Sequence, residues 1–506
     1  MRELHRKKPS HLQGGIKVKH VRGGRLKVLE KSQVYAVHMA TLEVLEHVGV
    51  NVKSVKGLKL LDEAGADVDF KRQIARIPSH LVEEALSKTP KRFTFFARRP
   101  EYHVKMEGER VHFSLGGLPT NIIDLDGKRR PALMKDAENV VRLMDALENV
   151  SLVDGGVYPT DIPDQVNHAY QFLARVENME KTGVSCLVQG VTVARDLLAL
   201  ASIVQGGIEE LKRRPFIYGH VNPVSPLTHD KLQTEGFLEF AKHGLPLGFS
   251  PEVQGGATGP ATLAGILVQQ NAEILSGITM AQLAAESRRR SPVIYGTVSS
   301  IFDMKTGVYV LGTAECGLIN VASAQIARYY GLPTRGTAGV TDSKTLDAQL
   351  YEAGVTLLMA ALGGINFILN AAGAMEPGVM ALSYAKMVID NDLIGMVTRI
   401  LEGIEVTDET LAVDVIGKVG PGGYFLTQKH TREFFRKEFY FPALSDRTSY
   451  ESWMKRGGKE LGQVALERAR QLLKEHQPQP LEKEVRLELR RMVKKIERRE
   501  LKGGRP

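Results

Sequence analysis

The sequence predicts an α/β fold, a (β/α)8 or TIM barrel with an N-terminal helical extension and a C-terminal helical segment. The chain has 506 residues, of which 43% are hydrophobic and 25% are charged, the composition of an ordinary globular enzyme. This length suits one large domain with terminal extensions. Between about residues 111 and 370, eight short apolar runs alternate with long amphipathic segments, a pattern typical of parallel strand-helix units.

The eight apolar runs are short enough to be strands, and they end in glycine, proline or polar residues. They cover residues 111–115, 151–157, 184–189, 215–220, 245–250, 292–297, 333–339 and 365–370. The first and seventh are the least typical, because the first leads into an expected hairpin at 123–127 and the seventh has few β-branched residues. A doubly wound open sheet is therefore an alternative to the barrel.

Helices are expected between these strands. They cover residues 164–181, 193–204, 260–286, 313–330 and 346–362. Pro260 stands at the favoured first-turn position of its helix. Upstream, Lys31–Leu86 has apolar residues such as Val37 and Leu42 at helical spacing, which predicts a small helical cap before the barrel.

The charge pattern and the element pattern together predict five regions. They are a basic N-terminal arm (1–28), an N-terminal helical cap (29–108), the barrel (109–400), a C-terminal segment packed on the barrel (401–480) and a basic C-terminal helix or tail (481–506). The formal charge of +9 comes from the two ends. Solvated tails are the plainer interpretation, and docking onto an acidic partner is the alternative. We expect no nucleic-acid binding, because no recognised binding module accompanies the tails.

Targeting and metal signals are absent from the sequence. No stretch reaches the roughly 18 apolar residues of a membrane span, and no apolar segment follows the first charged residues, so we expect a cytoplasmic protein without membrane contact. Cys186 and Cys316 are the only cysteines and have no paired spacing. The sequence therefore predicts neither a disulfide framework nor a metal site.

Candidate functional residues cluster where the predicted strands end, which is where barrel enzymes have their active sites. The candidate acids are Glu252, Asp342 and Glu315, and the candidate ligand contacts are Tyr158, His220, Asn222, Phe249, Gln254, Tyr295, Phe302 and Val340. A buried carboxylate such as Glu252 is costly unless it meets a cation or strong donors. Each candidate also has a structural interpretation: core packing for the aromatic residues, a hydrogen-bonded structural residue for His220 and a solvent-facing loop charge for Glu252.

Two of the acids have specific structural alternatives. Glu315 lies in the first turn of its expected helix, where a negative charge is favoured by the helix dipole. Asp342 precedes a segment that starts near Lys344, where it is a plausible N-cap. The run 255–260 could be mistaken for a phosphate cradle, but it lacks the Gly-Lys-Ser/Thr ending of such loops.

Several motifs resemble the trimethylamine methyltransferase superfamily of corrinoid-dependent methyltransferases, whose members also include enzymes that demethylate glycine betaine and related quaternary amines. The resemblance spans about residues 30–475. Its motifs are 255–265, Tyr295-Gly296 with Ser299-Ser300, 302–304 with Gly307, 312–315, 330–333, 339–344 with 347–349, and His430-Thr431. Archaeal trimethylamine enzymes of this family carry pyrrolysine where, as we place it, this chain has Val340.

The resemblance implies a methyltransferase that moves a methyl group from a quaternary amine to the Co(I) corrinoid of a partner protein. It implies that no corrinoid is tightly bound by the chain itself. The glycine-rich run 255–260 is expected to be a close-approach loop beneath the corrinoid or the substrate, and the candidate cofactor-binding residues are Gly255, Gly256, Ser299 and Ser300. The expected partners are a methylated amine, a corrinoid protein and further copies of this chain in a homo-oligomer.

A quaternary ammonium site must hold a permanent cation and exclude water, while no proton has to move. Trimethylamine is a poorer methyl donor, since its lone pair must be protonated or captured, and Val340 cannot supply that help. Two alternatives stay open: an enzyme of the same family acting on another methylated amine, and a non-catalytic betaine-binding or scaffold protein.

Overall fold

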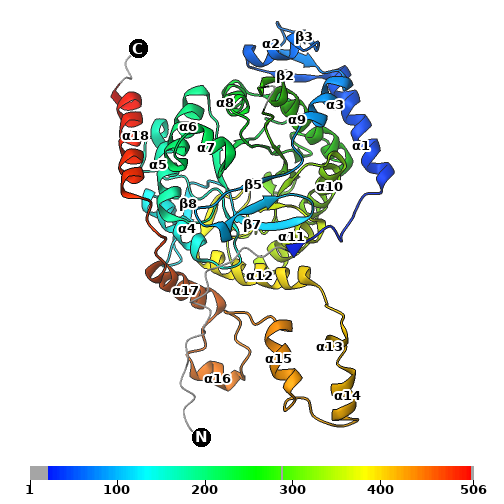
Figure 1. Ribbon diagram of the computed structural model, residues 1–506, viewed down its shortest axis with the longest axis vertical. Coiled ribbons are helices and arrows are strands. Elements are labelled where there is room, and N and C mark those ends of the chain that lie inside the picture. The colour runs from blue at the N-terminus through cyan, green and yellow to red at the C-terminus, as the bar shows by residue number, and fades with distance from the viewer. Residues whose placement is uncertain (1–20, 287–288, 503–506) are drawn as a thin grey trace.

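The computed structural model describes residues 21–286 and 289–502 (Figure 1). At its centre is a nine-stranded sheet of eight mutually parallel strands and one antiparallel edge strand, β1 (Val21–Arg22). The parallel strands are β7 (Arg110–Leu115), β10 (Leu152–Val153), β11 (Val184–Leu187), β12 (Ile217–Val221), β14 (Leu247–Phe249), β16 (Val293–Thr297), β19 (Thr334–Thr337) and β20 (Phe367–Leu369). Each of the eight expected runs thus contains one strand of this sheet.

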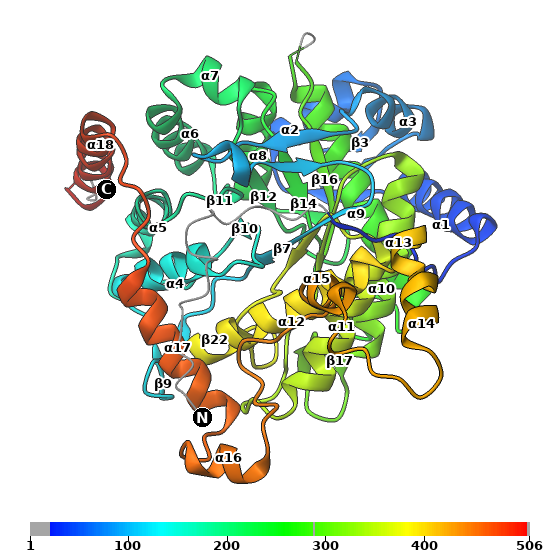
Figure 2. The same ribbon diagram turned by 60° about the horizontal axis from the view of Figure 1, so that its bottom comes forward.

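Neighbouring strands of the sheet follow one another along the chain. The path runs β11-β12-β14-β16-β19-β20-β7, and β10 pairs with the other side of β7. This order lacks the reversal of a doubly wound sheet, so that alternative is wrong. The sheet is strongly curled (Figure 2), and the backbone N–H of Val153, in β10, donates to the carbonyl oxygen of Thr182, just before β11, over 3.0 Å.

Helices follow the strands and cover the outer face of the sheet. They are α4 (Met134–Ala146), α5 (Asp164–Asn178), α6 (Val191–Gln205), α7 (Ile208–Arg213), α8 (Lys231–Lys242), α9 (Leu263–Ala284), α10 (Ala314–Tyr330), α11 (Gln349–Gly363) and α12 (Tyr384–Glu402). The five expected helices are present as α5, α6, α9, α10 and α11. The first-turn placement of Pro260 is wrong, because the chain is still extended at Thr262 and α9 begins only at Leu263.

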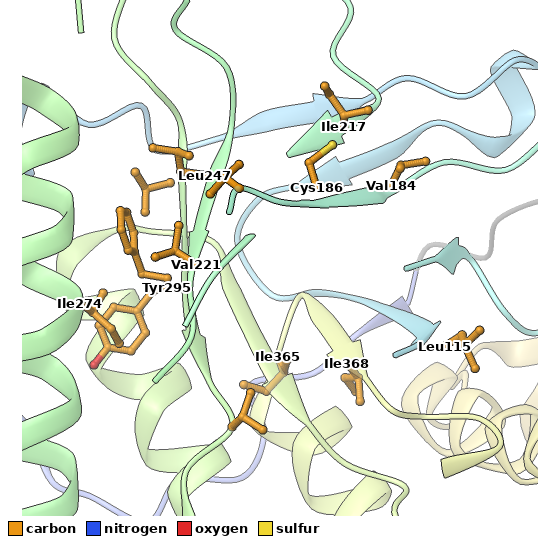
Figure 3. Close-up of a cluster of buried hydrophobic side chains, with 14 of the residues drawn as sticks. Leu115, Val184, Cys186, Ile217, Val221, Leu247, Ile274, Tyr295, Ile365 and Ile368 are labelled. Carbon is orange, nitrogen blue, oxygen red and sulfur yellow. The ribbon is translucent and has the colours of Figure 1, made fainter. Parts of the chain in front are cut away.

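The apolar core lies between the sheet and these helices. Tyr295 points outward beside Ile274 of α9 (Figure 3), and its hydroxyl donates to Asn271 Oδ1 over 3.0 Å. The hairpin of β5 (Phe93–Phe95) and β6 (Val104–Met106) covers the inner face of the sheet at the amino ends of its strands. The fully buried ring of Phe95 lies 5.8 Å from that of Tyr218. The amino ends of the strands are therefore closed, and only their carboxyl ends are open.

The N-terminal extension is mixed rather than purely helical. It contains α1 (Lys31–Glu43), a π-helical turn (Val44–Val48), β2 (Val50–Val52), α2 (Val55–Glu63), β3 (Asp67–Asp69), β4 (Ile74–Arg76), α3 (Ser79–Lys88) and a 3₁₀ turn (Pro100–Tyr102). Strands β2, β3 and β4 form a small sheet with β13 (Thr228–His229). The expectation of a helical cap missed these strands because three residues are too few to show an alternating pattern.

Short strands also lie along the carboxyl edge of the central sheet. β8 (Asn121–Ile123) and β9 (Arg129–Pro131) form the expected hairpin and pair with β21 (Ala374–Met375) and β22 (Ala381–Ser383). β15 (Gln254–Gly255), β17 (Ser300–Asp303) and β18 (Val308–Val310) make a second small sheet. These additions shape the rim around the open end.

The C-terminal region has two parts with different packing. α17 (Leu461–Glu475) packs on α12 and α4, and α18 (Lys483–Lys502) packs on α5 and α6. α13 (Asp408–Leu411), α14 (Val413–Val419), α15 (Lys429–Glu438) and α16 (Tyr450–Lys455) protrude below α12 (Figure 1). Most of the predicted basic arm, residues 1–20, lies outside the described residues.

Basic side chains of α18 pair with acids of the body. Arg490 forms two hydrogen bonds of 3.0 Å with Glu177, and Arg499 binds Asp196. At least these charges of the C-terminal helix therefore hold it against the body. In the described ranges, no helix is long and apolar enough to cross a membrane.

A fully buried ion pair joins α12 to the loops that follow β19 and β20. Lys386 Nζ donates to Asp390 Oδ2 and to the carbonyl oxygen of Gly339, both over 2.7 Å. Asp390 also accepts from the backbone N–H of Gly373 and from Gln349 Nε2 of α11. One pair thus fixes two strand-end loops and two helices relative to one another.

Replacing Lys386 with methionine is expected to destabilise the protein by about 3 to 5 kcal/mol, because it leaves a buried carboxylate without its cation. Urea unfolding of the Lys386→Met variant measures this. Lys135→Met, which removes an exposed partner of Glu138, is the control and should change stability by less than about 1 kcal/mol. Equal small changes in both variants would contradict the structural role of the pair.

Candidate active site

A cavity of about 380 Å³ lies at the carboxyl ends of the parallel strands. Every one of the eight strands, or the loop that follows it, supplies a lining residue. The lining residues are 117–120, Asp154, Gly155, Ser185, Leu187, His220, Asn222, Glu252, Val298, Tyr309, Leu311, Arg335, Leu369, Asn370 and 378–380. The volume is that of a small-molecule site.

Glu252 follows β14 and presents its carboxylate to the cavity. Asn222 Nδ2 donates to Glu252 Oε1 over 2.8 Å. Asn222 is itself fixed, because its backbone N–H donates to Gln233 Oε1 and its carbonyl oxygen accepts from Gln233 Nε2. Burial raises the pKa of Glu252, and the positive charge of Arg335 opposes that rise. This carboxylate therefore gains from a cation that replaces the lost water.

Arg335 of β19 places a positive charge in the same cavity. It is only 3% exposed, and its Nη1 donates to Ser250 Oγ over 2.8 Å. Its Nη2 lies 3.8 Å from Asp154 Oδ2, which also accepts a 2.7 Å hydrogen bond from the hydroxyl of Tyr218. The cavity thus has a carboxylate and a guanidinium, both held by neighbouring side chains.

Several buried polar atoms around the cavity have no hydrogen-bond partner among the described residues. They are Asp154 Oδ1, His220 Nδ1, Asn222 Oδ1, Arg335 Nε and Asn370 Oδ1. Burial, and next the charge of Arg335, hold the pKa of His220 well below its ordinary value, so its ring is neutral. Buried polar atoms are normally paired, so this concentration indicates a site for a polar ligand.

Backbone conformation at the rim is also unusual. Asn370, Glu376 and Val379, in the chain that follows β20, have φ values of 60°, 69° and 57°, a region that non-glycine residues rarely adopt. Gly155 has φ 78°, and a Cβ at this position would lie 2.4 Å from the carbonyl oxygen of Gly117. Such strain gathers at ligand sites, where surrounding structure holds it in place.

Comparison with known proteins identifies the family of the chain. Residues 2–503 match the family described as Trimethylamine methyltransferase (MTTB). The chain is 37% identical over 468 residues to a glycine betaine methyltransferase of Desulfitobacterium hafniense (strain Y51), covering 92% of this chain and 96% of that protein. It is 36% identical over 490 residues to a trimethylamine methyltransferase of D. hafniense (strain DSM 10664 / DCB-2), covering 96% and 97%.

This chain belongs to the trimethylamine methyltransferase family. It is accordingly a methyltransferase, and the resemblance inferred from its motifs is confirmed. Among solved structures, the monomethylamine methyltransferase of Methanosarcina barkeri matches with a TM-score of 0.51 at 13% identity, covering 90% of each chain. That likeness concerns the fold alone.

Three residues expected from the sequence lie together in the cavity of this family member: His220, Asn222 and Glu252. Tyr158 lies in a neighbouring cavity of about 360 Å³, where its hydroxyl donates to Asp164 Oδ1 over 2.6 Å. Burial is the main reason that the pKa of Tyr158 is raised to about 12.

The other aromatic candidates do not line the cavity. Phe249 packs against Phe237 with ring centroids 5.3 Å apart, and both Phe249 and Tyr295 belong to the core outside the sheet. Phe302 and Gln254 lie in the small sheet of β15, β17 and β18 at the rim. Alternation along a strand decides such placements: Phe249 points outward, and the next residue, Ser250, points inward to Arg335.

The side chain of Asp342 binds backbone groups and does not face the cavity. Its carboxylate accepts from the backbone N–H groups of Leu311 and Gly312, just before α10, and it is not among the lining residues. Burial raises its pKa to about 6. It is not the N-cap of the following helix, because α11 begins only at Gln349. Glu315 lies in the first turn of α10, and Val340 is fully buried; neither lines the cavity.

The four residues predicted to bind the cofactor make contacts around the loop that carries Glu252. Ser299 Oγ accepts from the backbone N–H of Val253 and donates to the carbonyl oxygen of Pro251. Ser300 Oγ lies 3.2 Å from Thr313 Oγ1. Gly255 pairs with Ile301, and Gly256 is exposed at φ 91°. These contacts fix the loop after β14 against the loop after β16.

The cavity residues that the sequence reasoning missed include Asp154, Tyr309 and Arg335. Arg335 and Asp154 lie within expected strand runs, where a charge among buried residues was the available signal. Tyr309 comes from β18, and nothing in its local pattern indicates that it folds over the cavity. Within the described chain, no cluster of three or more His, Cys, Asp or Glu residues is arranged to hold a metal ion.

An Asp342→Asn variant is expected to keep at least a third of the methyl-transfer activity, because an amide oxygen can still accept from the loop before α10. Since the folded pKa of Asp342 is raised, its charge is disfavoured on folding, and wild-type stability should fall as pH rises from about 4 to 6. The variant should lack this part of the pH dependence, as thermal unfolding would measure. Abolished activity in a folded variant would instead assign Asp342 to the chemistry.

Proposed function

We propose that this enzyme transfers a methyl group from a quaternary amine that also carries a carboxylate, a glycine betaine-like compound, to the Co(I) corrinoid of a partner protein. The observation that carries the proposal is the pair of opposite charges, Glu252 and Arg335, in one cavity of about 380 Å³. A betaine has the complementary pair of charges. A relative with 37% identity is named glycine betaine methyltransferase, which supports the same substrate class.

In this proposal the ammonium group lies against Glu252, and the carboxylate of the betaine accepts a hydrogen bond from the unpartnered Nε–H of Arg335. Asn222 keeps the Glu252 carboxylate oriented. Leu187, Leu311 and Leu369 supply apolar surface for the methyl groups and keep water away. Tyr309 is the only aromatic residue of the described lining, so the site relies on charge more than on the aromatic faces expected from the sequence.

The reaction breaks one C–N bond, and its electron pair stays on nitrogen, which leaves as a neutral tertiary amine. A corrinoid presented at the mouth would supply the Co(I) nucleophile that takes the methyl group. A corrinoid macrocycle is too large for a cavity of about 380 Å³. This supports delivery of the corrinoid by a partner protein rather than tight binding of it by this chain. The residues present therefore bind, orient and desolvate the amine, and none has to move a proton.

Glu252 must hold the cation without over-stabilising it, since the positive charge on nitrogen falls as the bond breaks. Its hydrogen bond to Asn222 and the nearby charge of Arg335 both weaken its pull on the ammonium group. The same two groups keep the carboxylate in place, so orientation is retained while ground-state binding stays moderate.

We also infer that the curled sheet closes as a (β/α)8 barrel. The consecutive order of eight parallel strands, the hydrogen bond from Val153 to Thr182, and the contribution of all eight strands to one cavity support this inference. A cytoplasmic location belongs to the same proposal, in line with the two free, buried cysteines, Cys186 and Cys316.

Trimethylamine is the second candidate substrate, because relatives at 31–36% identity are named trimethylamine methyltransferases. Protonated trimethylamine could bind Glu252, but it would leave Arg335 without a ligand partner. The non-catalytic betaine-binding alternative is disfavoured by membership of an enzyme family.

Methyl transfer to free cob(I)alamin tests the proposal directly. The full chain should consume Co(I), followed by its absorbance, when glycine betaine is added, and at least about ten times more slowly with trimethylamine. Equal or faster turnover of trimethylamine would favour the second candidate. Methyl transfer from S-adenosylmethionine to any acceptor would show that the proposed direction of the chemistry is wrong.

Glu252→Gln should weaken glycine betaine binding by about 5- to 150-fold, which corresponds to the roughly 1 to 3 kcal/mol expected for a lost buried charge partner. Because burial raises the pKa of Glu252, wild-type affinity should rise with pH as the carboxylate ionises, and the variant should lack this rise. Calorimetric titration between pH 5 and 8 measures both. Glu315→Gln is the matched control; an effect equal to that of Glu252→Gln would move the cation site to α10.

A further inference from the structure

The segment between α12 and α17, residues 403–460, is a solvent-exposed arm. None of its residues is buried, although it contains the four helices α13–α16. Figure 1 shows it below the rounded body of the protein. A segment of this length without a core of its own is not expected to be stable in isolation.

The arm is rich in uncovered large apolar side chains. They are Ile404, Val406, Leu411, Val413, Ile416, Tyr424, Phe425, Leu426, Phe439, Phe441, Tyr450 and Met454, with exposures from 45% to 88%. At about 200 Å² for each such side chain, these exposures leave on the order of 1,000 Å² of apolar surface, more than the roughly 800 Å² per partner of a stable interface. Soluble monomers rarely leave so much apolar surface uncovered in one region.

The base of the arm is firmly attached to α12, so its apolar surface has a defined position. The Asp392 carboxylate accepts from the backbone N–H groups of Ala443 and Leu444. Arg399 donates to both the carbonyl oxygen and the carboxylate of Glu438. The arm is therefore held at its foot while its apolar side chains face outward.

The charge of the arm indicates which kind of partner it can bind. Residues 403–460 contain nine basic and nine acidic side chains, so the arm has no net charge that would select a strongly acidic or basic partner. A mainly apolar partner surface therefore suits the arm better than a charged one.

The body of the same chain offers a second apolar face. Leu350, Tyr351 and Val355 on α11 are 69%, 65% and 49% exposed, and Leu318 on the neighbouring α10 is 36% exposed. The arm and the α11 face are both uncovered within one chain. Each can cover the other in a reciprocal contact between two copies.

We propose that residues 403–460 bind a second copy of this chain, with the arm of each copy packed on the α10–α11 face of the other. The interface does not include the cavity at the carboxyl ends of the strands, so the proposal stands independently of the substrate. It assigns the interface of the homo-oligomer expected from the sequence to a specific segment.

The test is the molar mass of the full chain in solution, by light scattering and sedimentation velocity at micromolar concentration. The wild type is expected to be a dimer or a larger closed oligomer. A triple variant, Leu411→Glu, Val413→Glu and Leu426→Glu, should raise the dissociation constant at least about 100-fold and give a monomer. Leu350→Glu with Tyr351→Glu should do the same from the other side of the interface.

Val48→Glu, Val55→Glu and Phe70→Glu form the matched control, since these N-terminal side chains are 58%, 55% and 45% exposed. The control should keep the wild-type mass. A Leu426→Cys, Leu350→Cys variant gives a second readout that needs no dissociation: a bifunctional maleimide should link the arm of one copy to the α11 face of the other, because both native cysteines are buried. A monomeric wild type, an arm variant that keeps the oligomer, or capture of only a corrinoid protein by the arm would overturn the proposal.

Discussion

Because the eight central strands run parallel in one curled sheet, their carboxyl ends meet at a single edge, and the site depends on this alignment. Asp154, Asn222 and Glu252 are far apart in the sequence, yet each follows a different strand, and Arg335 lies within a fourth, β19. The hairpin of β5 and β6 closes the opposite end with Phe95. One open end and one filled end leave a single place where a small molecule can meet side chains from all eight strands.

The charged groups of the cavity can be buried because they balance one another's charge and are hydrogen-bonded to neighbouring side chains. The positive charge of Arg335 is balanced by the nearby carboxylates of Asp154 and Glu252, and each of the three has a neutral hydrogen-bonding neighbour in Ser250, Tyr218 or Asn222. Such fixed dipoles and charges need little reorganisation when a ligand arrives. The atoms left unpaired, among them Arg335 Nε and His220 Nδ1, mark the directions from which a polar ligand would be held.

The strand and helix positions were predictable because strand-helix units repeat with a clear change of hydrophobic period. Glu252, Asn222 and His220 could also be found, since each directly follows or ends a predicted strand. Phe249 and Tyr295 were misjudged because a one-residue difference along a strand exchanges cavity and core, and the sequence does not show which set faces inward. Tyr309 and the arm at 403–460 depend on tertiary placement, which no local pattern reports.

The central claim is that the cavity is built for a molecule with one positive and one negative end. Calorimetric titration of the wild-type protein with glycine betaine, choline and tetramethylammonium tests it most directly, since all three are permanent cations and only the first has a carboxylate. The account predicts that glycine betaine binds at least about ten times more tightly than the other two, as expected for a charge-assisted contact with Arg335. Equal affinity for all three would contradict it, because Glu252 alone would then explain binding.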